Sequence, residues 1–415
     1  MTTLAAHRLA LACGFRHGIV PPVEDVTPTF GELRGFHNAF IDGDTASTRE
    51  SSSGGFARTR EGARAAAIAE ALERYSASLA RMPLAARSEL AGRRVLGAEE
   101  FALFSDEQLR AKDFAWPRAG ASARYAPVFS LADNHEAWAP QELVGLGTRV
   151  DPATLPSTST GLAAAPDPWW ALLSAVEELL ERDAFAAYWL NALPGRELAL
   201  PESYTQPVAE RGGEVRAFDL TQAWNPHPVV AVCGNLPLRG LRRFSLGAAC
   251  RPDWPRAVEK AFCEFLQGAV FAGYYLNEHR ALRFASPSEV RDFQQHGAYY
   301  TLRPDEWTRV PLLGAVAPPR ALPPPAPVEK PVAALQSLVR ALDAAGVRLY
   351  YRDLTLPDVA ACGLTVVRAL SPELSLLHGD EQAPFLGGRT RDVRWRWPAL
   401  ESHARFPNPL PHPLG

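Results

Sequence analysis

The chain has 415 residues, of which 47% are hydrophobic and 21% are charged, so it can bury a full core as one large domain or two ordinary ones. Its formal net charge is −3 with both signs spread along the sequence, which excludes the basic surface of a nucleic-acid-binding protein and the polybasic patch of a membrane-surface protein. Five scattered cysteines with no metal-ligand spacing indicate reduced thiols and a cytoplasmic protein.

The first fifty or so residues precede every motif described below, and we treat 1–50 as an N-terminal segment and 51–415 as one domain. The opening MTTLAAHRLALACGF contains a short apolar run that His7 and Arg8 interrupt, so it is not interpreted as a signal peptide. No stretch reaches the ~20 apolar residues of a membrane span.

Four segments have the apolar periodicity of helices, and three shorter segments rich in Val, Tyr and Leu are predicted as strands. The predicted helices are Gly62–Arg81, Trp169–Asn191, Pro255–Leu276 and Val332–Ala345, and the predicted strands are Pro228–Cys233, Val347–Arg352 and Thr365–Ala369. Helices that alternate with such strands predict a mixed α/β or α+β architecture.

Three of the helices carry two oxygen-bearing side chains three residues apart, hence on one helix face. These pairs, with the arginines that follow two of them, are Glu70, Glu73 and Arg74; Glu178, Glu181 and Arg182; and Glu264 and Gln267. One such pair is usually part of a solvated face. Here small residues fill the same stripes, so the carboxylates are expected to be partly desolvated and to need a cation. A set of oxygen ligands with no Cys or His suits Mg²⁺, which proteins usually bind together with the phosphates of a substrate. The arginines could then neutralise the phosphate oxygens.

Each of these helices follows a segment rich in glycine and small residues: SSSGGFART, STSTGLAAAPDP and GAACRPDWP. We interpret the three segments as loops, with Thr59, Asp167 and Asp253 as helix N-caps. Backbone N–H groups at such helix starts can bind anions. Together the three units predict a magnesium–nucleotide site built from several segments, and the lack of a GxxxxGK[ST] motif excludes a P-loop.

Two segments are rich in proline. The first, APPRALPPPAPVEKP at 317–331, cannot form a helix or a sheet ladder, and we interpret it as a loop within one domain because the sequence after it is too short for a second core. The second, FPNPLPHPLG at 406–415, has alternating prolines that predict a stiff, extended tail. We expect its removal to lower activity while changing thermal stability little.

In this order, the motifs resemble those of the YcaO family from about Ser51 to Gly415. SGGFARTREGARAAAIAEALERYS is similar to the family's first loop and ExxER helix, STSTGLAAAPDPWWALLSAVEELLERDAF to its second loop and ExxERDA helix, and GAACRPDWPRAVEKAFCEFLQ to its AxxExxQ helix. RDLTLPDVAACGLTVVRALSPELSLL resembles the late strand region, Arg389 falls where a late arginine is expected, and the proline-rich tail resembles that of azoline-forming members.

The sequence departs from the family pattern in all three units. Phe56 and Ala57 replace the lysine and the following glycine of the first loop, Thr160 and Ala165-Pro166 replace the asparagine and the later Gly-Asn of the second, and Ala269 replaces an arginine that is common after the third helix. Arg58 or Arg60 could supply the missing lysine charge. The acidic set is intact, whereas some nucleotide contacts are in doubt.

The resemblance implies a YcaO-like fold in which several helices converge on a nucleotide site next to β-sheets, with ATP and Mg²⁺ as cofactors. It implies that the metal ligands are Glu70, Glu73, Glu178, Glu181 and Glu264 and that the nucleotide-binding residues are Ser53, Gly54, Arg74, Arg182 and Gln267. The catalytic residues that it implies lie in the tail and are Pro411, His412, Pro413 and Gly415.

The implied reaction is an ATP-dependent cyclodehydration of a ribosomal precursor peptide. A Cys, Ser or Thr side chain attacks the preceding amide carbonyl, the amide oxygen is phosphorylated, and loss of phosphate leaves a thiazoline or oxazoline. Two alternatives stay open: a YcaO enzyme with another nucleophile, which forms a thioamide or an amidine, and a non-catalytic scaffold that binds a peptide or a partner.

The partners implied by the resemblance are the precursor peptide and a ubiquitin-activating-enzyme-like protein that binds its leader. The second partner is expected because about fifty residues before the motifs are too few for a separate peptide-clamp domain. A flavin-dependent azoline dehydrogenase and a second copy of the chain are further partners that the resemblance leaves open.

Overall fold

The computed structural model describes most of the chain, in two compact units. The described residues are 8–14, 18–26, 36–42, 52–114, 123–147, 155–315, 317–327, 329–401 and 405–415. Unit 1 comprises Met1–Phe101, Asp106–Leu179 and Glu329–Leu374, and unit 2 comprises Ala102–Ser105, Leu180–Val328 and Ser375–Gly415.

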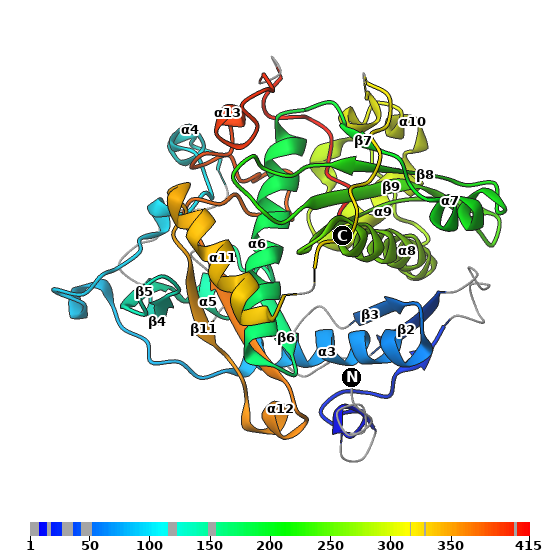
Figure 1. The fold of residues 1–415 in the computed structure, drawn as a ribbon. Coiled ribbons are helices and arrows are strands. Elements are labelled where there is room, and N and C mark those ends of the chain that lie inside the picture. The colour runs from blue at the N-terminus through cyan, green and yellow to red at the C-terminus, as the bar shows by residue number, and fades with distance from the viewer. Residues whose placement is uncertain are drawn as a thin grey trace. The chain divides into compact units, whose positions relative to one another are not determined.

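Unit 1 contains two antiparallel sheets (Figure 1). A three-stranded sheet has the order β1 (Glu24–Asp25), β2 (His37–Asp42), β3 (Ser52–Ala57). A five-stranded sheet has the order β5 (Glu136–Pro140), β4 (Tyr125–Ser130), β11 (Tyr350–Asp353), β12 (Thr365–Leu370), β6 (Leu162–Ala165). The helices are α3 (Arg60–Leu79), the first part of α6 (Pro168–Leu190), α11 (Pro331–Ala344), and the short α4 (Asp106–Arg110), α5 (Gln141–Val144) and α12 (Pro357–Ala361), with 3₁₀ turns at Arg87–Glu89 and Ala98–Glu100.

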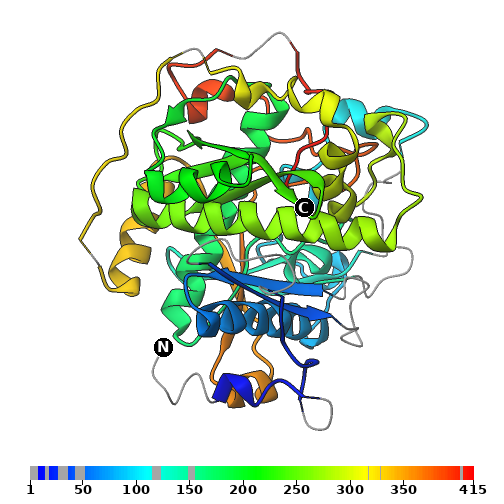
Figure 2. The ribbon, with the colours of Figure 1, turned by 90° about the vertical axis from the view of Figure 1, so that its right-hand side faces the viewer.

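Unit 2 is built on one antiparallel sheet with the order β10 (Leu241–Cys250), β9 (Val229–Leu238), β8 (Glu214–Asp219), β7 (Glu197–Leu198). Its helices are the second part of α6, α7 (Glu202–Ala209), α8 (Trp254–Glu278), α9 (Phe293–Leu302), α10 (Pro304–Trp307) and α13 (Val393–Arg396), with 3₁₀ turns at Pro287–Glu289 and Pro311–Leu313. Figure 2 shows α3 and α8 lengthwise, each beside the sheet of its own unit.

The predicted helices and strands are confirmed with ends shifted by at most three residues, apart from the end of β9, which lies at Leu238 and not at Cys233. The mixed α+β prediction is confirmed with them. The three predicted N-caps are also confirmed. Thr59 accepts a hydrogen bond from the backbone of Gly62 at 3.1 Å, Asp167 accepts from Trp169 at 2.9 Å, and Asp253 accepts from Arg256 at 2.9 Å. Each cap fixes the start of a helix that carries acidic side chains.

The interpretation of the segments before these helices as loops is wrong in part. Residues 52–57, 162–165 and 247–250 of these segments belong to the strands β3, β6 and β10, and the described residues that follow them lead into the helices as turns or irregular chain. Small residues serve close packing here: a Cβ at Gly55 would lie 2.1 Å from the carbonyl oxygen of Ala63 in α3, and one at Gly247 would lie 2.2 Å from that of Ala261 in α8. Glycine therefore lets β3 and β10 contact the helix that follows each of them, and the strands use backbone amides for sheet pairing and, at Gly54, for a carboxylate of α3.

In its described part, the proline-rich segment 317–331 forms no sheet ladder and no helix before Pro331, which begins α11, and a β-bridge joins Arg320 to Leu198. It leads the chain from unit 2 back to α11 of unit 1. In unit 1, β2, α3, β6 and β12 share one core, to which Ile41, Ala67, Leu162 and Val366 contribute buried side chains. None of the described helices is long and apolar enough to cross a membrane.

Candidate functional site

Three carboxylates lie near one another in unit 1. Glu70 and Glu73 come from successive turns of α3, and Glu178 comes from the part of α6 that belongs to this unit. Burial, followed by the negative charges of Glu178 and Glu70, raises the pKa of Glu73 to about 8. The positive charge of Arg74 and a hydrogen bond from the backbone of Ala164 offset this rise only in part. The surroundings of Glu73 therefore disfavour its charged form when no cation is bound.

Two hydrogen bonds fix the side chain of Glu70. The backbone N–H of Gly54 in β3 donates to its Oε2 at 2.9 Å, and the guanidinium of Arg74 donates to its Oε1 at 2.8 Å. Ser53 and Gly54, which the resemblance assigns to nucleotide binding, thus lie on the strand beside the acidic face of α3. The structure brings these predicted residues together, while their roles toward a nucleotide remain predictions.

The unit 1 carboxylates fit Mg²⁺. Their donors are oxygens only, and a divalent cation would favour the charged form of Glu73, which burial and the two neighbouring carboxylates disfavour. Within the described ranges, no three His, Cys, Asp or Glu side chains already surround a common point. Mg²⁺ shared with phosphates needs only one or two carboxylates and water, so this arrangement agrees with a metal that arrives with a nucleotide.

Sequence analysis missed Arg368 of β12, whose guanidinium is buried in unit 1. It donates hydrogen bonds to the carbonyl oxygens of Leu143 at 2.8 Å, Thr160 at 2.8 Å and Thr158 at 2.6 Å. Burial lowers its pKa to about 10, against the opposing charges of Glu178 and Glu73. Arg368 therefore fixes the segment that carries Thr160 and adds a positive charge within reach of the acids. The feature of the sequence that could have revealed Arg368 is a charged residue inside the otherwise apolar strand TVVRAL.

The acids of unit 2 have resident cations. Lys260 pairs with Glu264 on α8 at 3.0 Å, and Arg182 lies 3.5 Å from Glu181 on α6. Burial raises the pKa of Glu264, but the charges of Lys260, Arg182 and Arg251 outweigh it and lower the pKa overall. The carboxylates of Glu181 and Glu264 are thus neutralised without a metal, unlike that of Glu73. Gln267 lies half-buried one turn beyond Glu264.

The aspartate of the ExxERDA motif has a structural role. Asp183 is fully buried and forms an ion pair with Arg396 at 2.5 Å, and it accepts a hydrogen bond from the backbone of Ser375 at 2.8 Å. Arg389, the expected late arginine, instead lies at the surface over the ring of Trp395 at 4.0 Å. Arg396 thus makes a buried contact within unit 2 that the sequence pattern did not reveal.

Thr160 and Ala269, two departures from the family pattern, each accept a hydrogen bond at the backbone carbonyl from a buried arginine. Ala269 accepts a hydrogen bond through its carbonyl from the buried guanidinium of Arg243 at 3.2 Å, so a strand residue supplies positive charge at this turn of α8. Near Phe56, Arg58 lies 3.9 Å over the ring of Phe36. Arg60, the other candidate to replace the lysine, is engaged by Asp25 at 2.5 Å.

The proline-rich tail is docked within unit 2, and its residues from Leu410 to Leu414 are buried. Side chains hold its main chain: Trp189 donates to the carbonyl oxygen of Leu410 at 2.8 Å, and Tyr300 donates to that of Pro411 at 2.7 Å. The expectation that removing the tail costs little stability is therefore wrong, because burial of apolar side chains such as Leu410 and Leu414 would be lost.

His412 is held by two other histidines. The ring of His412 stacks on that of His296 with centroids 3.8 Å apart. Nε2 of His412 lies 2.7 Å from the carbonyl oxygen of His378, and Nδ1 of His296 lies 2.8 Å from the carbonyl oxygen of His412. Burial and the two neighbouring imidazoles hold its pKa well below the ordinary value, so the ring is neutral. At Gly415, a Cβ would lie 3.1 Å from the Cα of Gly297.

Comparison with known families gives one match, to the model of the YcaO cyclodehydratase, ATP- and Mg²⁺-binding, over residues 54–375. The sequence matches none of the curated proteins with which it was compared. The fold resembles a heterocyclase solved in complex with substrate and cofactor, with a TM-score of 0.78 and 22% identity over 98% of this chain and 57% of that one. This chain thus spans little more than half the length of that heterocyclase.

Two further solved structures have the same fold. YcaO from Methanopyrus kandleri, bound with AMPPCP and Mg²⁺, has a TM-score of 0.62 and 19% identity over 88% of both chains. The E. coli microcin synthetase McbBCD complex has a chain with a TM-score of 0.63 and 14% identity over 89% of this chain and 92% of that one. The predicted YcaO-like fold is confirmed by these similarities.

Proposed function

Because this chain belongs to the YcaO family, whose members bind ATP and Mg²⁺, we propose that it is an ATP-dependent peptide cyclodehydratase. It closes a Cys, Ser or Thr side chain of a precursor peptide onto the preceding backbone carbonyl. One water is lost from the peptide for each ring, and one ATP is converted to ADP and phosphate. The product is a thiazoline or an oxazoline.

The observation that carries this proposal is the acidic cluster of unit 1. Glu73 and Glu178 hold the metal, and Glu70 orients the cluster through its hydrogen bonds to Gly54 and Arg74. When bound, Mg²⁺ supplies charge neutralisation for the phosphates of ATP. Phosphoryl transfer depends mainly on positioning and charge, so an acid cluster whose charged form a bound cation favours is what the reaction requires of the protein.

We assign the tail a supporting role in this reaction. Pro411, His412, Pro413 and Gly415 were expected to be catalytic from the resemblance, and in unit 2 they form the docked part of the tail. The imidazole of His412 is buried and bonded to His378, so it holds the tail in place instead of exchanging a proton with the peptide. Glu181, Arg182, Glu264 and Gln267 remain proposed contacts of Mg-ATP.

The proposed partners are the precursor peptide and a separate leader-binding protein related to ubiquitin-activating enzymes. One similarity supports this part of the proposal. Another structure with this fold belongs to a microcin synthetase complex, McbBCD of E. coli. The isolated chain is expected to modify its peptide slowly until that partner is added.

The test compares two acids of the same helix. Glu73→Gln should abolish most Mg-ATP hydrolysis, because the metal loses a charged ligand in a poorly solvated site. Glu61→Gln is the matched control, since Glu61 is an exposed acid in the first turn of α3 with no hydrogen bond or ion pair to a described residue. Wild-type hydrolysis by a folded Glu73→Gln protein, with folding checked by circular dichroism, would refute the metal assignment.

A further inference from the structure

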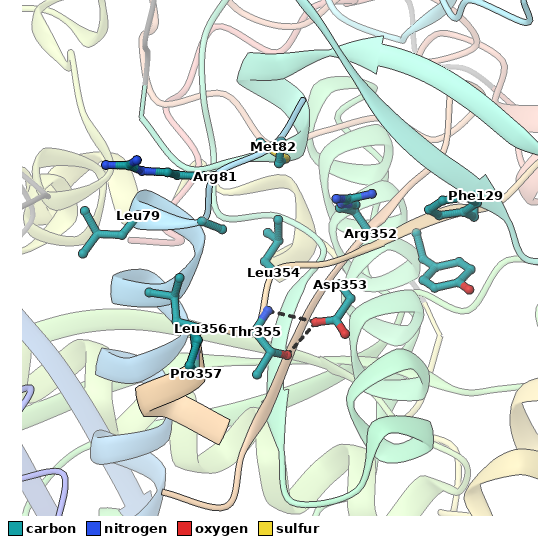
Figure 3. A pocket seen from close by; sticks show the side chains of 12 residues that line it. Leu79, Arg81, Met82, Phe129, Arg352, Asp353, Leu354, Thr355, Leu356 and Pro357 are labelled. Carbon is teal, nitrogen blue, oxygen red and sulfur yellow. Dashed lines mark hydrogen bonds between the residues drawn. The ribbon is translucent and has the colours of Figure 1, made fainter. Parts of the chain in front are cut away.

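Unit 1 has a surface pocket of about 780 Å³ that the proposed reaction does not use. Its walls come from the end of α3 and the residues after it, from Phe129 of β4, and from Tyr351–Pro357 of β11 and the turn that follows (Figure 3). Its walls combine apolar side chains with charged and polar ones, and Leu79 is 41% exposed although it is a large aliphatic side chain. A concave surface that joins apolar walls to a few charged groups is typical of a ligand site.

Two arginines of this pocket lack an acidic partner. Among the described residues, neither Arg81 nor Arg352 forms a salt bridge or a side-chain hydrogen bond, and Nε of Arg352 is buried without an acceptor. The guanidinium carbon of Arg352 lies 6.0 Å from the centre of the ring of Phe129. The nearby carboxylate of Asp353 is instead engaged by the backbone and hydroxyl of Thr355, at 2.9 and 2.6 Å.

The placement of these two charges favours an extended ligand. In Figure 3, Arg81 points away from Arg352, which lies on the side of Phe129. Two separated cations suit a chain with more than one acidic group better than a single compact anion. Strand β11 pairs with β12 as far as Asp353, whereas its pairing with β4 ends at Tyr351 opposite Phe129. Only Arg352 and Asp353 of β11 lack a β4 partner, so recognition of an extended ligand here rests on the side-chain charges and not on strand addition.

We propose that this pocket binds an extended segment of the precursor peptide in which acidic side chains alternate with large apolar ones. This inference rests on the function proposed above, because it takes the peptide substrate as the occupant. The acidic groups pair with Arg81 and Arg352, and the apolar side chains lie on Leu79, Phe129 and the other hydrophobic walls. A second anchoring point away from the reacting residue raises the local concentration of the peptide at the enzyme.

The probe is a short fluorescein-labelled peptide in which leucine alternates with aspartate and glutamate, and binding to the full chain is followed by fluorescence anisotropy. The matched peptide carries asparagine and glutamine in place of the acids. Arg352→Gln and Arg81→Gln should each weaken binding of the acidic peptide on the order of tenfold, and added salt should weaken it further. Arg340→Gln is the control, since Arg340 is an exposed arginine of unit 1 on α11 with no partner in the described part of the chain.

Reversing the two charges distinguishes a loss of charge pairing from a loss of folding, because an unfolded protein would not gain a new ligand. The double variant Arg81→Glu with Arg352→Glu should lose the acidic peptide and gain a peptide in which lysine replaces the acids. Equal binding of the acidic and amide peptides, or unchanged affinity in Arg352→Gln, would overturn the inference. ATP hydrolysis is measured on the same proteins: activity without peptide selectivity refutes the pocket alone, whereas no hydrolysis in any protein refutes the proposed function.

Discussion

A carboxyl group that stays protonated near neutral pH is the feature of Glu73 with the clearest consequence. Its pKa of about 8 lies above the ordinary value because of burial and of the charges of Glu178 and Glu70, so below pH 8 the folded apo protein holds a proton there. Mg²⁺ needs the carboxylate, so Mg-ATP binding must release that proton. We expect proton release at about pH 6.5, little at about pH 9.5, and Mg²⁺ affinity that rises between them.

Calorimetry in buffers of different ionisation enthalpy measures this proton release directly. Glu73→Gln should abolish it, while Glu61→Gln should leave it unchanged. Without Mg²⁺, the free energy of unfolding of the wild type should fall as the pH rises toward 8, because the pKa of Glu73 is raised in the folded state. An ion-paired acid, whose pKa is lowered, has the opposite pH dependence. Glu73→Gln should therefore be at least as stable as the wild type above pH 8, and a lower stability there would contradict the account.

Arg368 offers a second prediction at this scale. Arg368→Gln should lower the free energy of unfolding by about 3 kcal/mol, because up to three buried carbonyl oxygens lose their donor. Chemical denaturation measures the change, with Arg340→Gln as a surface control within ~0.5 kcal/mol of the wild type. A loss no larger than that of the control would mean that water replaces the guanidinium easily.

The site residues that were predicted from the sequence differ from those that were not in the sequence distance to the residues that they contact. Glu70, Glu73 and Glu178 were predicted because spacing on a helix is a local property of sequence. Arg368 contacts Thr158 and Thr160, which are 210 and 208 residues away, and no local pattern reports such a contact. His296, which stacks on a ring 116 positions later, was missed for the same reason.

At the scale of elements, helix periodicity was informative and glycine was ambiguous. The apolar stripes located α3, α6, α8 and α11 to within a few residues. The glycine-rich segments were taken for loops because glycine is typical of turns, yet Gly55 and Gly247 lie in strands pressed against helix backbones. Only the tertiary contact distinguishes these two uses of glycine, and a single sequence does not contain it.

The tail gives the prediction that belongs to this scale. Tyr300→Phe removes the hydrogen bond to the carbonyl oxygen of Pro411 and should cost about 1 kcal/mol, with a fall in ring formation but unchanged ATP binding. Tyr299→Phe is the control next to it, because the buried hydroxyl of Tyr299 has no hydrogen-bond partner within the described residues and its removal should be neutral or stabilising. Ring formation at the wild-type rate in Tyr300→Phe would separate tail docking from catalysis.

At the scale of the whole molecule, the order of motifs predicted more than any single motif. Three acidic helices and a proline-rich tail in family order led to a fold that the structural similarities confirm at 22% identity and less. The division into two units, each assembled from separate stretches of chain, was not predicted. Such a division depends on which distant segments share a core, whereas the sequence analysis considered segments one after another.

The central claim is that ATP is consumed to remove water from a peptide, and the ratio of the two events tests it most directly. The chain is incubated with Mg-ATP, the leader-binding partner and a Cys-, Ser- and Thr-rich peptide encoded beside it, and phosphate release is compared with peptide mass. The account predicts one phosphate for each water lost, with both lost in Glu73→Gln. Phosphate release with no loss of water, or exchange of oxygen for sulfur in the peptide, would contradict cyclodehydration.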